Sequence, residues 1–253
     1  MKPLSRMAEL MPPQVFVRLV ALQYRYFEPE LRHINSFVPA GRAAVDVGVW
    51  WGPWSWWLAR RASEVHAFEP NKAIFDGLSR ALPDNVHLHN LALSDRSSKA
   101  TLWSPSGGRG TEGRSSLLPG GHEGWRQQPV DTEMLDKFDL VDVGFVKIDV
   151  EGHELPVLLG SVELIDRERP NVLVEIEDAH HSVDDIEDVF SFFAQRGYSS
   201  TFFAQRRWRP LSDFDRDKAR QAGELAKSTG MLRSTMMGSD RYIHNFLFRA
   251  PES

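Results

Sequence analysis

The chain has 253 residues, of which 42% are hydrophobic and 26% charged, as in an ordinary soluble globular protein. That length is enough for one large domain with a substantial buried core. The net charge of −5 excludes a global attraction to nucleic acid, and the lack of cysteine excludes disulfides, thiolate metal sites and a cysteine nucleophile.

Residues 1–42 are predicted to form a helical extension. After two prolines, apolar residues recur at helical spacing: Val15, Leu19, Leu22 and Tyr26. We expect an amphipathic helix that lies on the domain with this face, or is shared with a second subunit in a homodimer. Arg18 and Arg25 interrupt the apolar stretch, so it is no secretory signal, and no run reaches the ~18 residues of a spanning helix. The sequence therefore predicts a cytoplasmic protein without a membrane span, with membrane attachment as the less favoured reading.

From residue 43 to the end, short β-rich segments alternate with helical ones. Strands are predicted at 43–49, 64–70, 85–93, 99–104, 145–150, 171–177, 198–203 and 243–250. Helices are predicted at 53–62, 71–82, 154–165 and 183–197. This alternation predicts an α/β, doubly wound, mostly parallel sheet, closed by an antiparallel pair formed by the last two strands.

Two insertions interrupt the predicted domain, at about 104–129 and 205–241. The first is rich in glycine, and the second is basic. Long insertions in a compact domain are often lids over a functional site. We expect both to form walls of an acceptor site.

Ligands of a doubly wound sheet bind at the carboxyl ends of its strands. The first predicted strand carries Asp46 and runs into a turn with Gly48 and Gly52, where backbone can approach a ligand closely. Glu69 ends the next strand, 21 residues after Gly48, where a carboxylate can accept both ribose hydroxyl protons. A plain tight turn and a helix-capping carboxylate are the alternatives, but the two features in register indicate a nucleoside site.

The charge of this turn indicates which nucleoside. A dinucleotide needs G-x-G-x-x-G to cradle pyrophosphate, whereas this chain reads D-x-G-x-x-x-G from Asp46. An acid there opposes phosphate but suits the cationic methionyl end of S-adenosylmethionine, and Trp50, Trp51 and Trp54 offer aromatic faces to a sulfonium or an adenine. The pattern therefore favours a methyl donor over NAD.

Five segments within residues 43–180 together resemble the FkbM family of methyltransferases. They read DVGVWWGPWS, AFEPN, NVHLHNLALSD, FVKIDVEGHELPVLLGS and NVLVEIE, and KIDVEGHEL is the most specific part. The resemblance implies a class I (Rossmann-like) methyltransferase fold, S-adenosylmethionine, and transfer to oxygen, often on sugars of natural products or glycans. By position it places cofactor contacts at Asp46, Gly48 and Gly52 (methionyl part), Glu69 (ribose), and Asn90, Leu91 and Ala92 (adenine).

The chain departs from the family pattern after the first glycine. Val49 and Trp50 stand where the family usually has alanine and asparagine. Because that asparagine often helps to hold the methionyl carboxylate, the resemblance leaves this contact to Ser55 or to backbone groups.

The reacting end is predicted after the strand at 145–150. A protonated sugar hydroxyl is a poor nucleophile, so a base or a metal should assist it. Asp149, Glu151 and His153 cluster there, and a neutral His153 could take the proton while Asp149 holds the acceptor. Packing alone is the alternative for His153, and contact with a helix dipole is the alternative for Glu151 and the preferred role for Glu154.

A metal is a second way to activate the hydroxyl. Asp149 ends one strand, and Glu175 or Glu177 ends the next, so two carboxylates could converge on Mg²⁺, which favours hard oxygen ligands. His180 and His181 are second-choice bases. A catalytic Mg²⁺ at Asp149 and Glu175 is thus an open alternative.

Together these patterns predict an S-adenosylmethionine-dependent O-methyltransferase that acts on a sugar or glycan hydroxyl. A non-sugar small molecule is the alternative acceptor. An NAD-dependent oxidoreductase would need the missing glycines, and a non-catalytic module would be expected to lose Asp46 and Glu69. The negative charge and the absence of an Asn-Pro-Pro motif disfavour nucleic acid and protein as acceptors.

Overall fold

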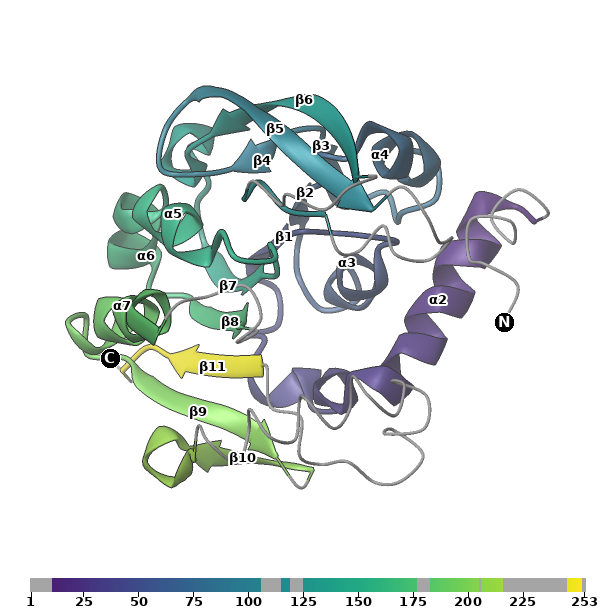
Figure 1. Cartoon of the computed structure of the whole chain (residues 1–253). Helices are drawn as coiled ribbons and strands as arrows, with labels where there is room; N and C mark the ends of the chain where they lie inside the picture. Colours follow the sequence, from purple (N-terminus) through teal and green to yellow (C-terminus); the bar gives the residue numbers. More distant parts are fainter. Residues whose placement is uncertain are drawn as a thin grey trace.

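The computed structural model describes residues 11–105, 115–118, 125–176, 183–204, 206–215 and 245–251. Its main sheet has the strand order β10-β9-β11-β8-β7-β1-β2-β3 (Figure 1). The strands are β1 (Ala43–Val47), β2 (Val65–Phe68), β3 (Val86–His89), β7 (Val143–Ile148), β8 (Asn171–Glu175), β9 (Ser199–Ala204), β10 (Arg207–Pro210) and β11 (Asn245–Arg249). Neighbours from β3 to β8 are parallel, and β11 is antiparallel to both β8 and β9. The predicted mostly parallel sheet with a closing antiparallel strand is confirmed.

Helices cover both faces of this sheet, because alternate residues of its buried strands point to opposite sides. One core cluster packs the strands against α5 (Glu154–Leu159), α6 (Val162–Glu168) and α7 (Val183–Ala194). The opposite clusters pack them against α3 (Pro53–Leu58), the short helices η1 (Pro29–Arg32) and η2 (Ile34–Ser36), and, farther out, α2 (Pro13–Phe27) and α4 (Lys72–Leu78). The predicted helix at 154–165 is therefore two helices, divided at Gly160.

A small second sheet lies beyond the carboxyl ends of β1 and β2 (Figure 1). Its order is β4 (Ala92–Leu93), β6 (Trp125–Glu133), β5 (Ser98–Pro105), and the helix η4 (Leu135–Phe138) leads from it back to β7. The predicted strand at 85–93 is thus β3 plus β4, in different sheets. The first insertion begins in β5 and ends in β6, which pair along their whole length.

Of the second insertion, the structure describes 206–215, where β10 pairs with β9 and continues into η5 (Leu211–Asp213). Glu177, His180 and His181, which were proposed as a metal ligand and second-choice bases, lie outside the described residues. In the described ranges no helix combines the length and the apolarity that a membrane crossing requires.

Helix α2 lies on the domain with a different face from the one expected. Its buried residues are Phe16, Val17, Val20 and Ala21, which pack against α3 and α4. The predicted stripe points to solvent: Val15, Leu19, Leu22 and Tyr26 are all exposed. The expectation that this stripe packs on the domain is wrong, because both stripes are apolar and both recur at helical spacing, so periodicity alone could not choose between them. The alternative, that the stripe is shared with a second subunit, stays a prediction.

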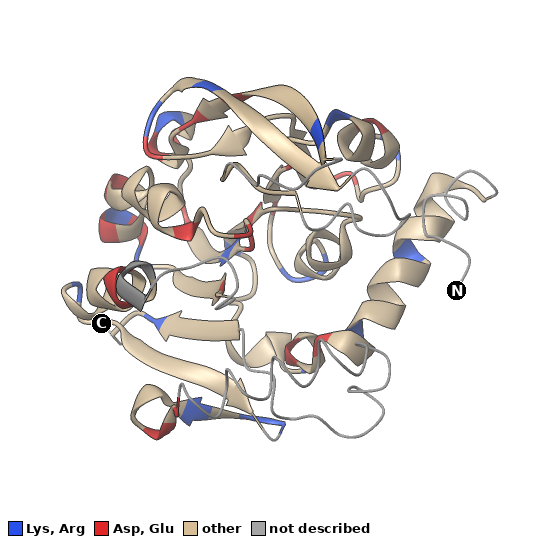
Figure 2. Ribbon diagram, viewed as in Figure 1, with Lys and Arg blue, Asp and Glu red and all other residues tan. Residues whose placement is uncertain are grey.

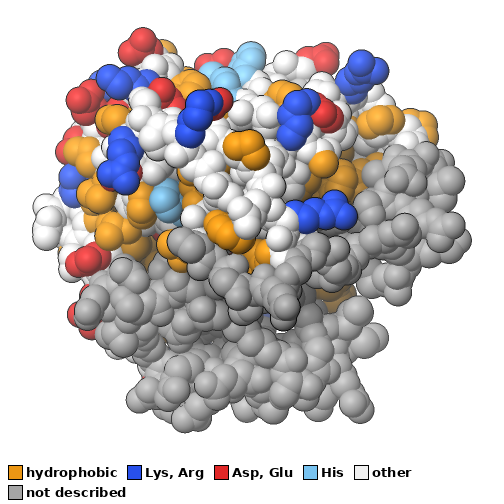
Figure 3. Space-filling model, turned by 45° about the horizontal axis from the view of Figure 1, so that its top comes forward, with side chains coloured by type: hydrophobic (Ala, Val, Ile, Leu, Met, Phe, Trp, Pro, Cys, Tyr) orange, Lys and Arg blue, Asp and Glu red, His pale blue; other side chains and the backbone are white. Residues whose placement is uncertain are grey.

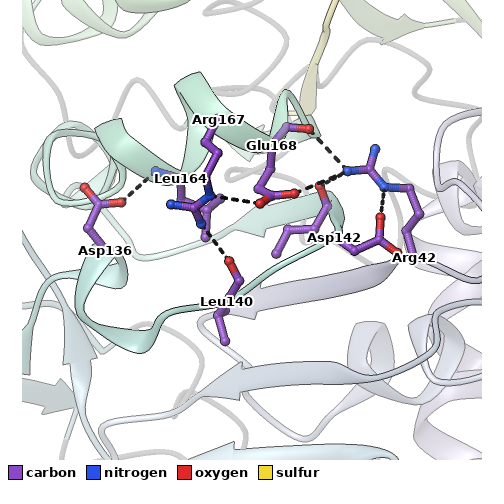
Figure 4. A network of polar contacts seen from close by, with 8 residues as sticks. Arg42, Asp136, Leu140, Asp142, Leu164, Arg167 and Glu168 are labelled. Carbon is purple, nitrogen blue, oxygen red and sulfur yellow. Dashed lines mark hydrogen bonds and ion pairs between the residues drawn. The ribbon is translucent and has the colours of Figure 1, made fainter.

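Hydrogen bonds of arginine and aspartate side chains connect the segments at the amino ends of the strands (Figure 4). Arg42, just before β1, donates to Asp142 at 2.8 Å and to the carbonyl of Val143 at 2.9 Å. Asp136 accepts bonds from the amides of Glu163 and Leu164 in the first turn of α6. These groups are mutually satisfied and lie at the end of the sheet opposite to the one where ligands of this fold bind.

Seen from the face that carries the small sheet, basic and acidic side chains of the described residues lie side by side, with apolar ones between them (Figure 3). Lys99 on β5, for example, pairs with Asp131 on β6 at 2.8 Å. The described residues of this face therefore carry charges of both signs.

Three histidines stack at the β2–β3 edge of the main sheet. The ring of His66 lies 5.0 Å from that of His87 and 5.7 Å from that of His89, and His89 stacks on Phe68 at 4.7 Å. Burial, and then the neighbouring rings, lower the pKa of His89 to about 4; burial also lowers the pKa of His66, against the charge of Glu64. Burial in this stack therefore favours the neutral forms of His66 and His89.

We expect this stack to make stability fall with acid. The pKa of His89 is lower in the folded state than in the unfolded one, so its contribution is complete above pH 6.5 and is lost as the pH falls towards 4. Because the ring is only partly buried, we expect a loss of about 1 kcal/mol rather than the full value of the shift. Urea unfolding on both sides of this window should show His89→Phe to be less acid-sensitive than the wild type; equal losses would contradict the assignment.

Candidate active site

Ionisable side chains gather on one face of the sheet, at the carboxyl ends of its central strands. Asp46 on β1 is the register partner of Lys147 on β7, and Glu175 closes β8 on the far side of Lys147. Glu69 follows β2 directly, and Asp149 follows β7. The period of two puts Asp46, Lys147 and Glu175 on the face covered by α3 and η1.

Asp46 is a fully buried carboxylate without a complete set of partners. Its Oδ2 accepts the hydroxyl proton of Ser55 at 2.5 Å, while its Oδ1 has no hydrogen-bond partner. Burial raises the pKa of Asp46 to about 6, although Lys147 and Ser55 act in the opposite direction. The bond gives Ser55 a role in orienting Asp46; its expected contact with a methionyl carboxylate stays a prediction.

Glu69 is held rigidly by backbone amides. Its Oε2 accepts from the N–H of Trp50 at 2.9 Å, and its Oε1 accepts from the N–H of Asn71 at 2.8 Å. Burial raises the pKa of Glu69 to about 7 against these two bonds. Each oxygen keeps a further lone pair, so the carboxylate is oriented to accept two more hydrogen bonds, as the two hydroxyl groups of a ribose would donate.

The glycine turn between β1 and α3 has its own steric reasons. A Cβ on Gly48 would lie 1.8 Å from the carbonyl oxygen of Asp149, and one on Gly52 would lie 2.9 Å from the side chain of Leu82. Both glycines also have positive φ. Gly48 thus brings the ends of β1 and β7 together, which fixes where Asp149 stands relative to Asp46.

Lys147 is the functional residue that the sequence reasoning missed. Its side chain is 1% exposed, and its Nζ donates to Asp149 Oδ2 at 2.8 Å. Burial alone would lower the pKa of Lys147, but nearby carboxylates raise it above its ordinary value. They are those of Asp149, Glu28, Glu175 and Asp46. A lysine in the apolar run of 145–150 was the available signal.

The N-terminal extension adds two further polar residues to this cluster. Glu28 accepts a bond from the indole of Trp54 at 2.5 Å, and Tyr24 donates its hydroxyl to Glu28. Burial, and then the charges of Glu28, Glu175 and Asp149, raise the pKa of Tyr24 well above its usual range. Residues 24–28 thus form part of the wall beside Lys147.

His153 lies on another side of the site. Its Nε2 is 2.9 Å from Ser94 Oγ, and burial lowers its pKa against the charges of Glu154 and Asp95. Glu154 accepts from the amide of Gly152 at 3.0 Å, which fits its preferred role in the first turn of α5. The described contacts place His153 beside the loop after β4, whereas Asp149 is bound to Lys147.

The expected adenine contacts surround the turn after Glu69. Asn90 donates to the carbonyls of Glu69 at 2.9 Å and Pro70 at 3.2 Å, while Leu91 is half-buried and Ala92 begins β4. Gln128 of β6 also donates to Pro70, at 3.0 Å. The small sheet is thereby tied to the nucleoside end of the main sheet.

The tryptophans divide into core and site. Trp54 stacks on Phe145 and Trp51 packs edge-on to Phe16, so both belong to the core. Trp50, at φ 49°, lies with its ring 5.4 Å from that of Tyr24. Trp50 therefore borders the site, and Trp54 also reaches it, because its ring centroid lies 5.6 Å from Lys147 Nζ and its indole donates to Glu28.

The described residues offer no further ligand to the proposed metal site. The described residues contain no group of three histidine or acidic side chains arranged to hold one ion. Asp149 is bound to a lysine cation, and Glu175 acts on the same cation. Mg²⁺ at Asp149 and Glu175 stays a prediction that this geometry does not support.

These features define the class of protein. The mostly parallel strand order, the antiparallel strand β11 beside β8 and the acidic ends of β1 and β2 are those of a class I, S-adenosylmethionine-dependent methyltransferase. The residues fit the cofactor: Asp46 has an unmatched oxygen for the cationic methionyl end, and Glu69 is oriented for the ribose.

The family is established by sequence. Residues 43–200 match the methyltransferase FkbM domain, and the chain belongs to this family. No curated protein matches the chain significantly.

Several solved methyltransferases are similar in structure. One is the methyltransferase FkbM from Methylobacillus flagellatus KT, at 15% identity and a TM-score of 0.47, covering 82% of this chain and 56% of that one. Another, from Streptococcus mutans and in complex with SAH, has 8% identity, a TM-score of 0.46 and coverages of 88% and 97%. An rRNA methylase from Streptococcus thermophilus has 10% identity, a TM-score of 0.45, and coverages of 88% of this chain and 95% of that one. The chain thus spans little more than half of the Methylobacillus protein.

We expect Glu69→Ala to weaken binding of S-adenosylmethionine by roughly 1–3 kcal/mol, the usual cost of unmatched polar groups in a buried pair. Affinity should also depend on pH. Because the raised pKa values of Glu69, about 7, and Asp46, about 6, let protons compete with the ligand, binding should be strongest above pH 7 and weaken as the pH falls through 6.

Titration calorimetry with S-adenosylmethionine, S-adenosylhomocysteine and NAD tests this assignment. Glu64→Ala is the control, since Glu64 is partly exposed and lies just before the start of the same strand, β2. Binding of NAD without a response to either adenosyl ligand would overturn the cofactor assignment.

Proposed function

We propose that the protein is an S-adenosylmethionine-dependent O-methyltransferase whose acceptor is a hydroxyl group of a sugar or glycan. The observation that carries the reaction type is Asp149, a carboxylate fixed by Lys147 beside the glycine turn of the cofactor site. Its side chain is 26% exposed, in contrast to 1% for Lys147. Asp149 is therefore the member of the pair that an acceptor can reach.

The chain's own residues would work as follows. The bound cofactor supplies a methyl group on a cationic sulfur. Asp149 would accept a hydrogen bond from the acceptor hydroxyl and would take its proton when that oxygen accepts the methyl group. Asp46 and Glu69 would hold the donor, which would be left as a neutral thioether. Lys147 keeps Asp149 from rotating away, and excess negative charge around Lys147 favours the cationic donor.

The small sheet supports the second element of the proposal, a walled acceptor site. Ser116, in the first insertion, pairs with Trp103 of β5 and donates its hydroxyl to the carbonyl of Glu151 at 2.6 Å. Ser116 therefore joins the described part of the insertion to the loop that follows Asp149. That contact supports the expectation that it borders the acceptor.

His153 is the alternative base. Its bond to Ser94 supports a structural role, namely linking the loop after β7 to β4. We accordingly assign proton acceptance to Asp149 and keep His153 as the competing assignment. A chelator-sensitive reaction would instead favour the Mg²⁺ hypothesis at Asp149 and Glu175.

Asp149→Asn should lower kcat by about 10²–10⁴-fold, the usual contribution of general-base catalysis, with cofactor affinity preserved. Asp142→Asn is the matched control, because Asp142 sits at the amino ends of the same strands. His153→Gln and Ser94→Ala should lower the melting temperature by similar amounts and keep most of kcat. Loss of kcat in His153→Gln alone, with Asp149→Asn active, would return the role to His153.

The acceptor class is tested separately. The protein with labelled S-adenosylmethionine is offered nucleoside diphosphate sugars, oligosaccharides, free sugars and non-sugar hydroxyl compounds, with and without Mg²⁺, and products are read by mass spectrometry. A methylated sugar oxygen supports the proposal. Methylation confined to a non-sugar compound would leave the reaction type intact but overturn the acceptor.

A further inference from the structure

Helix α2 exposes an apolar stripe that the fold leaves uncovered. Its four side chains are 46%, 45%, 46% and 59% exposed. They are Val15, Leu19, Leu22 and Tyr26. Their spacing of four, three and four residues places them on one line, while the opposite side of α2 is buried against α3 and α4. Four of the seven large apolar side chains that are exposed in the described residues lie on this stripe.

Two arginines, Arg18 and Arg25, rim the stripe on one side of α2, and the guanidinium of Arg25 stacks over the ring of Trp57 with its Nε buried. Helix α2 contains Arg18 and Arg25 and no acidic residue, as Figure 2 also shows by its blue and tan ribbon. Arg18 is near enough to act electrostatically on Arg60, and Gln14 donates to the carbonyl of Arg80 at 2.6 Å. Within the described part of the chain, no carboxylate forms an ion pair with Arg18, Arg60 or Arg80. This side is basic although the whole chain carries a net charge of −5.

We propose that α2 docks on the surface of a membrane that contains anionic lipids. A helix of this kind lies in the interface plane, with its apolar side chains at the boundary of headgroups and acyl chains and its basic ones at the lipid phosphates. Tyr26 suits that boundary, because its ring is apolar and its hydroxyl can stay hydrated.

Charge distinguishes this occupant from a second copy of the chain. A two-fold dimer interface is self-complementary, so each protomer would bring the same arginine rim to the other. Arg18 and Arg25 would then face basic surfaces across a small apolar strip, whereas anionic headgroups neutralise them. The stripe of four side chains is also narrow beside the roughly 800 Å² that each partner of a stable complex usually buries.

The test is co-sedimentation of the full chain with phosphatidylcholine vesicles that do or do not contain phosphatidylglycerol. We expect binding to the anionic vesicles that weakens with salt, and little binding to the neutral ones. The double variant Leu19→Gln, Leu22→Gln should lower the partition coefficient by at least about tenfold, because each leucine loses its apolar burial. Arg18→Gln should lower it about fivefold on anionic vesicles alone.

Val141→Gln is the matched control, since Val141 is 68% exposed in the loop before β7. It should bind vesicles like the wild type, and all variants should keep the melting temperature because the changed side chains are exposed. Failure of the wild type to bind anionic vesicles overturns the proposal, as does equal binding to neutral ones. A wild-type dimer that Leu19→Gln, Leu22→Gln converts to a monomer in light scattering would assign the stripe to a second copy instead.

Discussion

The architecture of the site depends on one buried ammonium group. Lys147 sits inside the sheet at the end of β7, and carboxylates compensate its charge. Asp149 follows β7 directly, and the others come from the residue between α2 and η1, from β8 and from β1: Glu28, Glu175 and Asp46. Removing one partner of a buried ion pair typically costs about 3–5 kcal/mol, because the remaining charge is left in a poorly solvating environment. Strand register, the close approach at Gly48 and the position of η1 are therefore constrained together, and Asp149 is aimed as a consequence.

The polar groups at the two ends of the sheet differ in how completely their charges are compensated. At the amino ends, Arg42 and Asp142 are mutually satisfied, so that region contributes to stability without needing a ligand. At the carboxyl ends, Asp46 and Glu69 have raised pKa values because burial is incompletely offset. Folded carboxyls with raised pKa values favour the protein below their unfolded pKa and disfavour it as pH rises through the folded value. A ligand that supplies positive charge and hydrogen bonds from its hydroxyl groups would offset this cost.

The sequence predicted the features that depend on local patterns, and it missed those that depend on contacts between distant segments. The alternation of strands and helices is a local pattern, and it predicted the sheet correctly. The acids at the ends of β1 and β2 are local patterns too, and the nucleoside site that they indicate stays a prediction. Lys147 was overlooked because a strand pattern shows that a residue is buried but not which charges surround it. Tyr24 and Glu28 could not be assigned because their role depends on long-range packing of α2 and η1. The prediction of which face of α2 packs on the domain was wrong, because this helix has two apolar stripes and the sequence alone does not show which one is buried.

The N-terminal extension contributes residues to the candidate site, although it lies outside the segment that matches the family. The match begins at residue 43, yet Glu28 and Tyr24 act on the charges around Lys147 and Asp149, and Trp50 packs against Tyr24. The ring of Trp50 stands where relatives usually carry asparagine, and its amide holds Glu69. Helix α2 thus connects three features: the charges around Lys147 and Asp149, the Trp50 loop that holds Glu69, and the exposed apolar stripe. Because these residues lie partly outside the shared domain, the choice of acceptor belongs to this chain and cannot be transferred from the family alone.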